Sequence, residues 1–425
     1  MKSDIKKVIF LLIITILYFF CLFLELKTKM SYIFILLCLC FIVSNIRKEI
    51  VCANNLFIAY FLYTVGIGPI FLISNGIEYK YDFFQVILGS LLSFVWGSLL
   101  VFSNKSKKIK KTRIKQSIVK ISKEDIIFLI YLFSISVSIY FLFSNRAYLF
   151  GSNVNSYRMK AYSGNGKITF ISQIQIMLVP MMYDLYIRNK DKIKIKYKAV
   201  VMFIISSILL LFFGFRTPLM TMYIWVALLY MKDKNTKMIE IMKIIGVLII
   251  IVSILGYIRN VKSNGVQLNT SFLDNLKTTF VVNLYNLDYI FNKFPLKVPF
   301  QKGYTYLINF IMLRPGPDLD FTLWLKEKLG LSFSGGGVTP TVMGEFYINY
   351  GKVGIYTGMF LLGKIGNKLK TFCRKRENFY IGIFYSWEFA HCVSGGIANV
   401  ILKVILYTII YKIILFFSFK EVNRS

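Results

Sequence analysis

The stretch DIIFLIYLFSISVSIYFLFS, residues 125–144, carries one charged residue, at its first position, and is otherwise almost entirely apolar. Its length suits an α-helix that crosses the hydrocarbon core of a bilayer, which takes about 20 residues. Similar runs recur through the 425-residue chain, in which 56% of residues are hydrophobic and the mean hydropathy is +0.61. A soluble protein of this length would not have such runs. The sequence therefore predicts an all-α integral membrane protein.

Working outward from this stretch in both directions, we place about twelve membrane-spanning helices. The seventh and eighth are short, and the segment GFRTP joins them at residues 214–218. The joint indicates either a broken helix pair, as at binding sites in transporters, or a plain tight turn with Arg216 at the lipid headgroups. The expected helices cover residues 7–26, 31–46, 51–74, 82–102, 125–144, 168–188, 199–215, 217–231, 241–258, 346–365, 377–395 and 397–418.

The basic residues orient these helices. The formal net charge is +32, and most Lys and Arg lie in short clusters between apolar runs, the densest at 105–123. Even-numbered helices lead into such clusters, so the positive-inside rule places both termini in the cytoplasm. No basic domain stands apart from the apolar runs, which argues against nucleic acid as a partner. Two long segments, 145–167 and 259–345, then face the outside.

The longer outer segment is expected to be structured. Its stretch 272–291 repeats large apolar residues at helical spacing, so we expect an amphipathic helix there. The chain accordingly divides into N-terminal transmembrane helices (1–258), a large extracytoplasmic loop (259–345) and C-terminal transmembrane helices (346–425).

Arginines mark the outward side, whereas the inner clusters use mainly Lys. The planar guanidinium binds phosphate oxygens in pairs, and a diphosphate needs more than one positive group. For any single arginine, contact with lipid headgroups is an equal alternative. The set as a whole predicts an anionic ligand on the outer face. It comprises Arg146, Arg158, Arg216, Arg259 and Arg314.

An isolated acid stands out in the stretch SGGGVTPTVMGEFYINYGKVG, residues 334–354. Thr339 is expected to cap a helix here, with Pro340 at its first position. Glu345 would then lie in the first turns, where the helix dipole favours an acid. The alternative is a general base beside a sugar hydroxyl. The residues Tyr347, Asn349 and Tyr350 suit sugar binding by stacking and hydrogen bonding.

Other ionisable groups give weaker signals. His391, the only histidine, follows Glu388 by one turn inside an expected helix, and is either a packed neutral residue or a functional one. The pair Asp318 and Asp320 could hold a metal, but Asp320 fits better as the cap of a helix in FTLWLKEKL. The six cysteines form no CxxC pair, and no cofactor fingerprint is present. We therefore expect neither a metal nor a cofactor.

These motifs resemble the signature of the Wzy-type oligosaccharide repeat-unit polymerases. That family has a glycine-rich segment before a GE-x-Y-x-N-(F/Y)-G-x-x-G run. It also has a G-x-x-Y…P segment and a Gly-x-Arg ahead of a helix. Here the matching residues are Gly344, Glu345, Tyr347, Asn349, Tyr350, Gly351 and Gly354; Gly303, Tyr304 and Pro315; and Gly214 and Arg216.

The resemblance implies a GT-C-like, metal-independent glycosyltransferase in the bacterial cytoplasmic membrane with its active site on the extracytoplasmic face. Its substrate would be an undecaprenyl-diphosphate-linked oligosaccharide within the membrane lipid, and a flippase and a chain-length regulator would be partners. The implied roles are diphosphate binding by Arg216, Arg259, Arg314 and Arg158; base catalysis by Glu345, with Asp318 and His391 in reserve; and sugar binding by Tyr347, Asn349 and Tyr304.

Two other functions fit the same layout. A lipid-linked oligosaccharide flippase or transporter would move the same ligand, but it should show two related helix halves, and the sequence has no internal repeat. An O-antigen-ligase-type glycosyltransferase would share the chemistry and differ in its acceptor.

Overall fold

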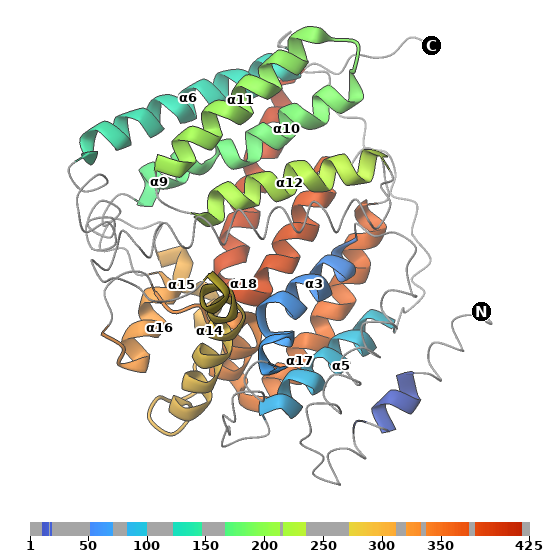
Figure 1. Ribbon diagram of the computed structural model, residues 1–425, viewed down its shortest axis with the longest axis vertical. Helices are drawn as coiled ribbons and strands as arrows, with labels where there is room; N and C mark the ends of the chain where they lie inside the picture. The colour runs from blue at the N-terminus through green and yellow to red at the C-terminus, as the bar shows by residue number, and fades with distance from the viewer. Residues whose placement is uncertain are drawn as a thin grey trace. The chain divides into compact units, whose positions relative to one another are not determined.

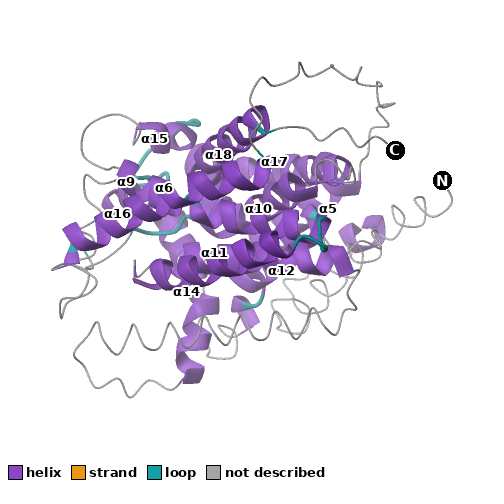
Figure 2. Cartoon of the chain, turned by 90° about the horizontal axis from the view of Figure 1, so that it is seen from above, coloured by secondary structure: helices purple, strands orange, loops and turns teal. Residues whose placement is uncertain are grey.

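The computed structural model describes residues 11–16, 18, 52–70, 83–99, 122–146, 166–212, 216–234, 272–311, 320–332, 337–373 and 379–418. Within these ranges every regular element is a helix (Figures 1 and 2). The chain divides into two compact units. The first comprises Met1–Phe102, Thr270–Ile311 and Leu319–Ile401, and the second comprises Ser103–Asn269, Met312–Asp318 and Leu402–Ser425.

The second unit is a bundle of apolar helices joined by hydroxyl groups. Tyr131 donates a hydrogen bond to the Met202 carbonyl (2.9 Å) and accepts one from Ser206 (3.2 Å), which joins α6 to α11. These bonds satisfy polar groups inside an apolar interior, where an unpaired group is costly. The helices are α6 (Lys123–Ser144), α9 (Gly166–Gln173), α10 (Gln175–Arg188), α11 (Ile193–Phe212) and α12 (Arg216–Lys234).

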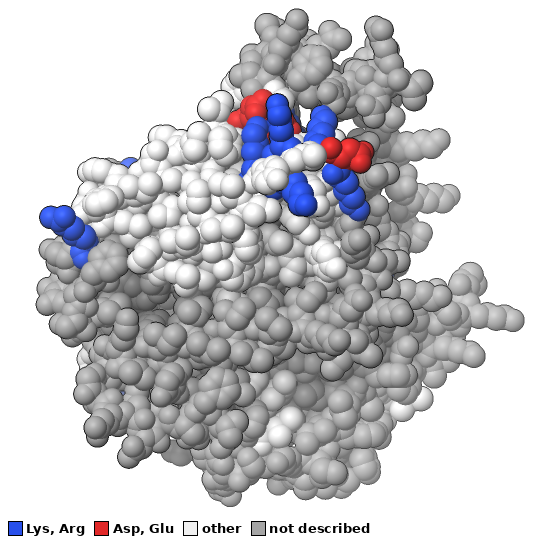
Figure 3. All heavy atoms as spheres, turned by 45° about the horizontal axis from the view of Figure 1, so that its top comes forward, with Lys and Arg blue, Asp and Glu red and all other residues white. Residues whose placement is uncertain are grey.

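Charged side chains gather at one end of this bundle. Lys198, near the start of α11, forms an ion pair with Asp125, near the start of α6 (2.7 Å). Arg188, at the end of α10, pairs with the buried Asp184 (3.0 Å). Most of the visible Lys and Arg side chains lie together in Figure 3. The starts of α6 and α11 therefore share an end, as the basic clusters in the sequence predict.

The first unit holds the helices that the sequence placed in the long outer loop, together with transmembrane segments. Glycines allow α5 and α17 to pack closely: a Cβ on Gly97 or Gly363 would overlap backbone atoms of the facing helix. The elements are α3 (Ala53–Phe61), the π-helix η1 (Leu62–Gly66), α5 (Phe83–Leu99), α14 (Phe272–Lys293), α15 (Thr305–Ile311), α16 (Phe321–Leu329), α17 (Thr341–Cys373) and α18 (Phe379–Phe417), the last of which continues into the second unit beyond Ile401.

Five helices of the described residues are long and apolar enough to cross a membrane, and two more apolar helices are shorter. They coincide with eight of the twelve expected spans. The expected spans 31–46 and 241–258 lie outside the described residues, as does 7–26 apart from a few helical residues. The five are Ala53–Ile70, Lys123–Ser144, Lys167–Arg188, Ile193–Phe212 and Phe379–Phe417, and the shorter two are Phe84–Leu99 and Thr217–Met231.

Two long helices are interrupted by a glycine. α17 contains a non-helical residue, Gly351, and α18 contains another, Gly396. The expected span 346–365 thus includes a corner, and the expected spans 377–395 and 397–418 form one broken helix. The amphipathic helix predicted at 272–291 is confirmed as α14.

Candidate functional site

The start of α17 differs from the expected cap. Thr341, rather than Thr339, accepts the hydrogen bond from the Gly344 amide (3.1 Å). The Thr339 hydroxyl instead donates to Asn283 on α14 (3.1 Å). Thr341 is buried and has a positive φ of 58°, which is strained for a β-branched residue. Such strain persists only where surrounding contacts enforce it, and it concentrates at functional sites.

Gly351 forms a sharp corner in α17. Its φ of 65° and ψ of −156° favour glycine. Beyond the corner the chain folds back on itself, because a Cβ on Gly354 would lie 2.6 Å from the Phe346 carbonyl and one on Gly358 2.5 Å from the Phe346 ring. The segment Thr341–Tyr350 is therefore a short half-helix packed against the rest of α17. Its last carbonyls are left free to accept bonds from elsewhere.

Glu345 lies within this half-helix and is completely buried. Its carboxylate accepts hydrogen bonds from the backbone amides of Ile397 and Ala398, the latter at 3.1 Å to Oε1. It also accepts one from the Thr305 hydroxyl (3.3 Å). Charge-assisted bonds of this kind offset the cost of removing a carboxylate from water.

The break in α18 explains why these amides are available. Gly396 has a φ of 77° and a ψ of 173°, so a new helical segment begins after it. The first amides of a helix have no partner within that helix. The Glu345 carboxylate supplies the missing acceptor from a different element, and the positive end of the helix dipole favours its charge.

A chain of polar groups continues from Glu345 to the segment before α15. Asn349 donates to the Thr305 hydroxyl (2.6 Å) and accepts from the Gly303 amide (2.8 Å). The neighbouring amide of Gln301 donates to the Ile348 carbonyl (2.9 Å) that the corner leaves free. We call the carboxylate and amide side chains of Glu345 and Asn349, with the Thr305 hydroxyl, the break cluster.

Tyr306 lies next to the break cluster. Burial, and secondarily the charge of Glu345, raises the pKa of its phenol above the ordinary value. The raised pKa of this phenol reflects how closely it lies to the apolar interior and to the buried Glu345.

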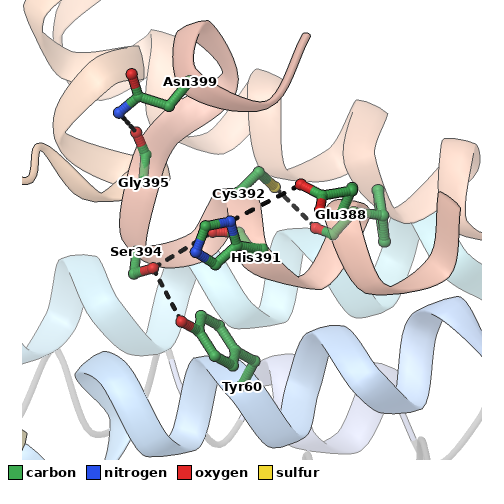
Figure 4. A network of polar contacts seen from close by, with 8 residues as sticks. Tyr60, Glu388, His391, Cys392, Ser394, Gly395 and Asn399 are labelled. Carbon is green, nitrogen blue, oxygen red and sulfur yellow. Dashed lines mark hydrogen bonds and ion pairs between the residues drawn. The ribbon is translucent and has the colours of Figure 1, made fainter. Parts of the chain in front are cut away.

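A second polar group precedes the same break. His391 Nδ1 lies 3.9 Å from Oε2 of the fully buried Glu388, and the His391 side chain is 16% exposed. A hydrogen bond joins the Tyr60 and Ser394 hydroxyls (3.1 Å), and the Tyr60 ring meets the imidazole edge-on (Figure 4). We call these four residues the histidine cluster. α3 therefore contributes to the region around the α18 break.

The π-helix η1 ends close to the same region. Asn283 on α14 donates to the Thr64 carbonyl within η1 (3.3 Å) and accepts from Thr339. π-Helical turns occur frequently at functional sites. Irregular backbone features of the first unit include η1, Lys302–Gly303, Thr341, Gly351 and Gly396. Their convergence on the break and histidine clusters makes this region the candidate site.

Comparison with known families identifies the chain. A family model described as "Putative O-antigen polymerase" matches residues 4–411. The chain belongs to the O-antigen polymerase family. No curated protein and no solved structure matches it. Membership of the family implies a glycosyltransferase-type activity, and the family and the apolar helices together indicate a multi-pass membrane protein.

In the structure of this O-antigen polymerase family member, some of the predicted site residues lie close together. Glu345 and Asn349 belong to one hydrogen-bonded cluster, and His391 lies beside Glu388 as their spacing predicted. Tyr304 is 47% exposed. Tyr347 donates to the Phe294 carbonyl (3.2 Å) and packs on Phe291, so it contributes to packing against α14.

None of the predicted diphosphate-binding arginines has a described side chain. Arg158, Arg259 and Arg314 lie outside the described residues, as does Asp318. Arg216 is the first residue of α12 in the second unit, and its side chain is not described. The neighbouring Asp320 caps α16, as expected, by accepting from the Leu323 amide (2.7 Å).

Sequence reasoning missed Thr305, Tyr60 and Ser394. Thr305 adjoins the Gly303–Tyr304 motif, and Ser394 precedes the Gly395–Gly396 pair. Proximity to these motifs was the one available signal. Tyr60 is more than 300 residues from its partner Ser394, and nothing in its local sequence distinguishes it from other tyrosines in apolar runs.

Proposed function

We propose that this protein polymerises lipid-linked oligosaccharide repeat units on the extracytoplasmic face of a bacterial cytoplasmic membrane. The observation that carries the proposal is the family match over residues 4–411. The growing glycan would leave its undecaprenyl diphosphate and join the non-reducing end of a new lipid-linked unit. A GT-C-like fold with about twelve spans and both termini in the cytoplasm belongs to the same proposal.

The reaction needs positive charge at the leaving group. The bond between the anomeric carbon and the diphosphate oxygen breaks, and a bond to the acceptor hydroxyl oxygen forms. The diphosphate leaves with an added negative charge, which arginines aimed at it would stabilise in the transition state. We assign this role to Arg216, Arg259, Arg314 and Arg158. No metal or cofactor is part of the proposed reaction.

The reaction also needs an acceptor for the hydroxyl proton. Glu345, Asp318 and His391 are the three predicted candidates. Support for His391 comes from its arrangement: it is partly exposed, and the buried Glu388 lies on its Nδ1 side. A base oriented by a carboxylate is a recurring catalytic arrangement. Base catalysis by Glu345 or Asp318 stays a prediction, and so does sugar binding by Tyr347, Asn349 and Tyr304.

The proposed partners follow from the substrate. A flippase would deliver the lipid-linked unit to the outer face, and a chain-length regulator would set the size of the product. Membrane lipid surrounds the substrate's polyprenyl chain.

The proposal is tested by deleting the gene in its host and sizing the lipid-linked glycan, with the plasmid-borne gene as the matched control. We expect single repeat units to accumulate on the outer face and long polymer to disappear, because polymerisation follows export. Single units trapped on the inner face would identify a flippase instead. Long lipid-linked polymer that is no longer transferred to its final acceptor would identify a ligase.

A further inference from the structure

Three donors bind the Glu345 carboxylate, and one of them, the Ala398 amide, is shared between its two oxygens. Oε1 accepts from the Ala398 amide and the Thr305 hydroxyl, and Oε2 accepts from the amides of Ile397 and Ala398. Each oxygen of a carboxylate has two lone pairs. A base must accept a proton on one of these oxygens, and this proton would remove the negative charge that strengthens the bonds holding the break in α18.

The same bonds make Glu345 a connector of three elements. It lies on the half-helix of α17, its carboxylate caps the segment of α18 after Gly396, and Thr305 is the first residue of α15. A Cβ on Gly396 would lie 2.5 Å from Oε2 and 3.1 Å from Pro340. The carboxylate therefore sits directly against the break, with no space between them.

Asn349 extends this connection to an exposed surface. It binds Thr305 and the Gly303 amide, and Gly303 lies against the Tyr350 hydroxyl, which would be 2.9 Å from a Cβ at this position. Tyr304 and Tyr350 are 47% and 51% exposed. We call these two side chains the tyrosine face. An aromatic face with a phenolic hydroxyl offers a sugar both an apolar surface and a hydrogen-bonding group.

We propose that Glu345 is a positioning residue, which caps the second segment of α18 and, through Thr305 and Asn349, holds the tyrosine face in place for a sugar of the acceptor unit. The inference rests on the proposed polymerase function for its substrate. The cap and its connection to residues 301–305 are independent of that function. Base catalysis by Glu345 is the competing role.

Turnover of purified enzyme on lipid-linked repeat units separates the two roles. Glu345→Gln keeps one accepting oxygen and should retain turnover within about tenfold, whereas Glu345→Ala should lose at least about 100-fold. Thr305→Val should lower kcat by about tenfold, and Thr305→Ser should restore it. Thr357→Val is the matched control, since Thr357 is exposed and binds only carbonyls of its own helix. Equal inactivity of Gln and Ala, with full activity of Thr305→Val, would establish the base role and overturn the proposal.

Hydrogen exchange measured by mass spectrometry tests the cap without any substrate. We expect Glu345→Ala and Thr305→Val to speed exchange in the peptide that contains Ile397 and Ala398, and Thr357→Val to leave it unchanged. Unchanged exchange in Glu345→Ala would overturn the proposal even if the protein is a polymerase. If Glu345→Ala speeds exchange but deletion of the gene leaves long polymer intact, the capping role of Glu345 is supported and the proposed polymerase function is wrong.

Discussion

Glu345 and Glu388 are both completely buried, yet their carboxylates face different partners. Glu345 meets backbone amides and a hydroxyl, which fix its position. Glu388 lies near an imidazole that can take up a proton and keep a charge stabilised by the carboxylate. Because their neighbours differ, Glu345 suits the role of a fixed connector, whereas Glu388 suits the role of a partner to the proton acceptor His391.

His391 gives the residue-scale prediction. His391→Asn keeps a polar side chain of similar size but removes the basic nitrogen, so kcat should fall by roughly 100- to 10,000-fold. Glu388→Gln should reduce kcat less, because an amide oxygen remains but the negative charge is lost. The measurement is single-turnover transfer from lipid-linked donor, with Tyr223→Phe in the second unit as control. Undiminished single-turnover rates in His391→Asn would remove His391 from the chemistry.

The sequence identified some members of the site and not their contacts. Glu345 and Asn349 stood in a motif, and His391 was the only histidine. The wrong cap at Thr339 shows the limit: local rules favour Ser or Thr before an apolar run, but Asn283 of α14 engages Thr339, and Thr341 becomes the cap. Long-range partners of this kind leave no mark in a local pattern.

At the scale of elements, apolar length predicted the helices well, and the division between spans at residue 396 coincides with the break at Gly396, but the corner at Gly351 was missed. An apolar run of about 20 residues predicts a spanning helix, as for α6 and α11. It does not reveal that the run is interrupted at Gly351, because glycine is also common where straight helices pack closely. Gly97 and Gly363 serve that second purpose. Sequence patterns do not distinguish the two uses.

The break at Gly396 gives the element-scale prediction. Gly396→Ala forces alanine into a backbone conformation that essentially only glycine adopts, about 1–3 kcal/mol, and a steric conflict with Glu345 adds about 1–3 kcal/mol. Gly351→Ala is the control, since Gly351 has a similar backbone conformation (φ 65°, ψ −156°) and a Cβ there would meet the Phe300 ring at 3.1 Å rather than a carboxylate at 2.5 Å. Thermal unfolding in detergent should therefore show a distinctly larger loss for Gly396→Ala. Equal losses of thermal stability in the two variants would mean that the Glu345 side chain moves aside without cost.

At the scale of the whole molecule, the charge pattern predicts in which direction each helix crosses the membrane. The ion pair between Asp125 and Lys198 puts the starts of α6 and α11 at one end of the second unit, in agreement with the expected alternation. The division of the chain into 1–258, 259–345 and 346–425 stays a prediction along the sequence. In space, α14, α15 and α16 from the expected loop belong to the first unit with α17. A sequence pattern does not contain that grouping, because it depends on contacts such as Asn349 with Gly303.

Labelling of introduced cysteines tests the orientation of the whole molecule. Lys302 and Lys194 are both exposed, and the positive-inside rule places Lys302 outside and Lys194 in the cytoplasm. In intact cells (spheroplasts if an outer membrane is present), a membrane-impermeant maleimide should label Lys302→Cys and leave Lys194→Cys unlabelled until the membrane is permeabilised. The parent protein is the control for its own cysteines, of which Cys52, Cys373 and Cys392 are buried. The reverse labelling would place the tyrosine face in the cytoplasm, where an exported repeat unit is absent, and the polymerase proposal would fail with it.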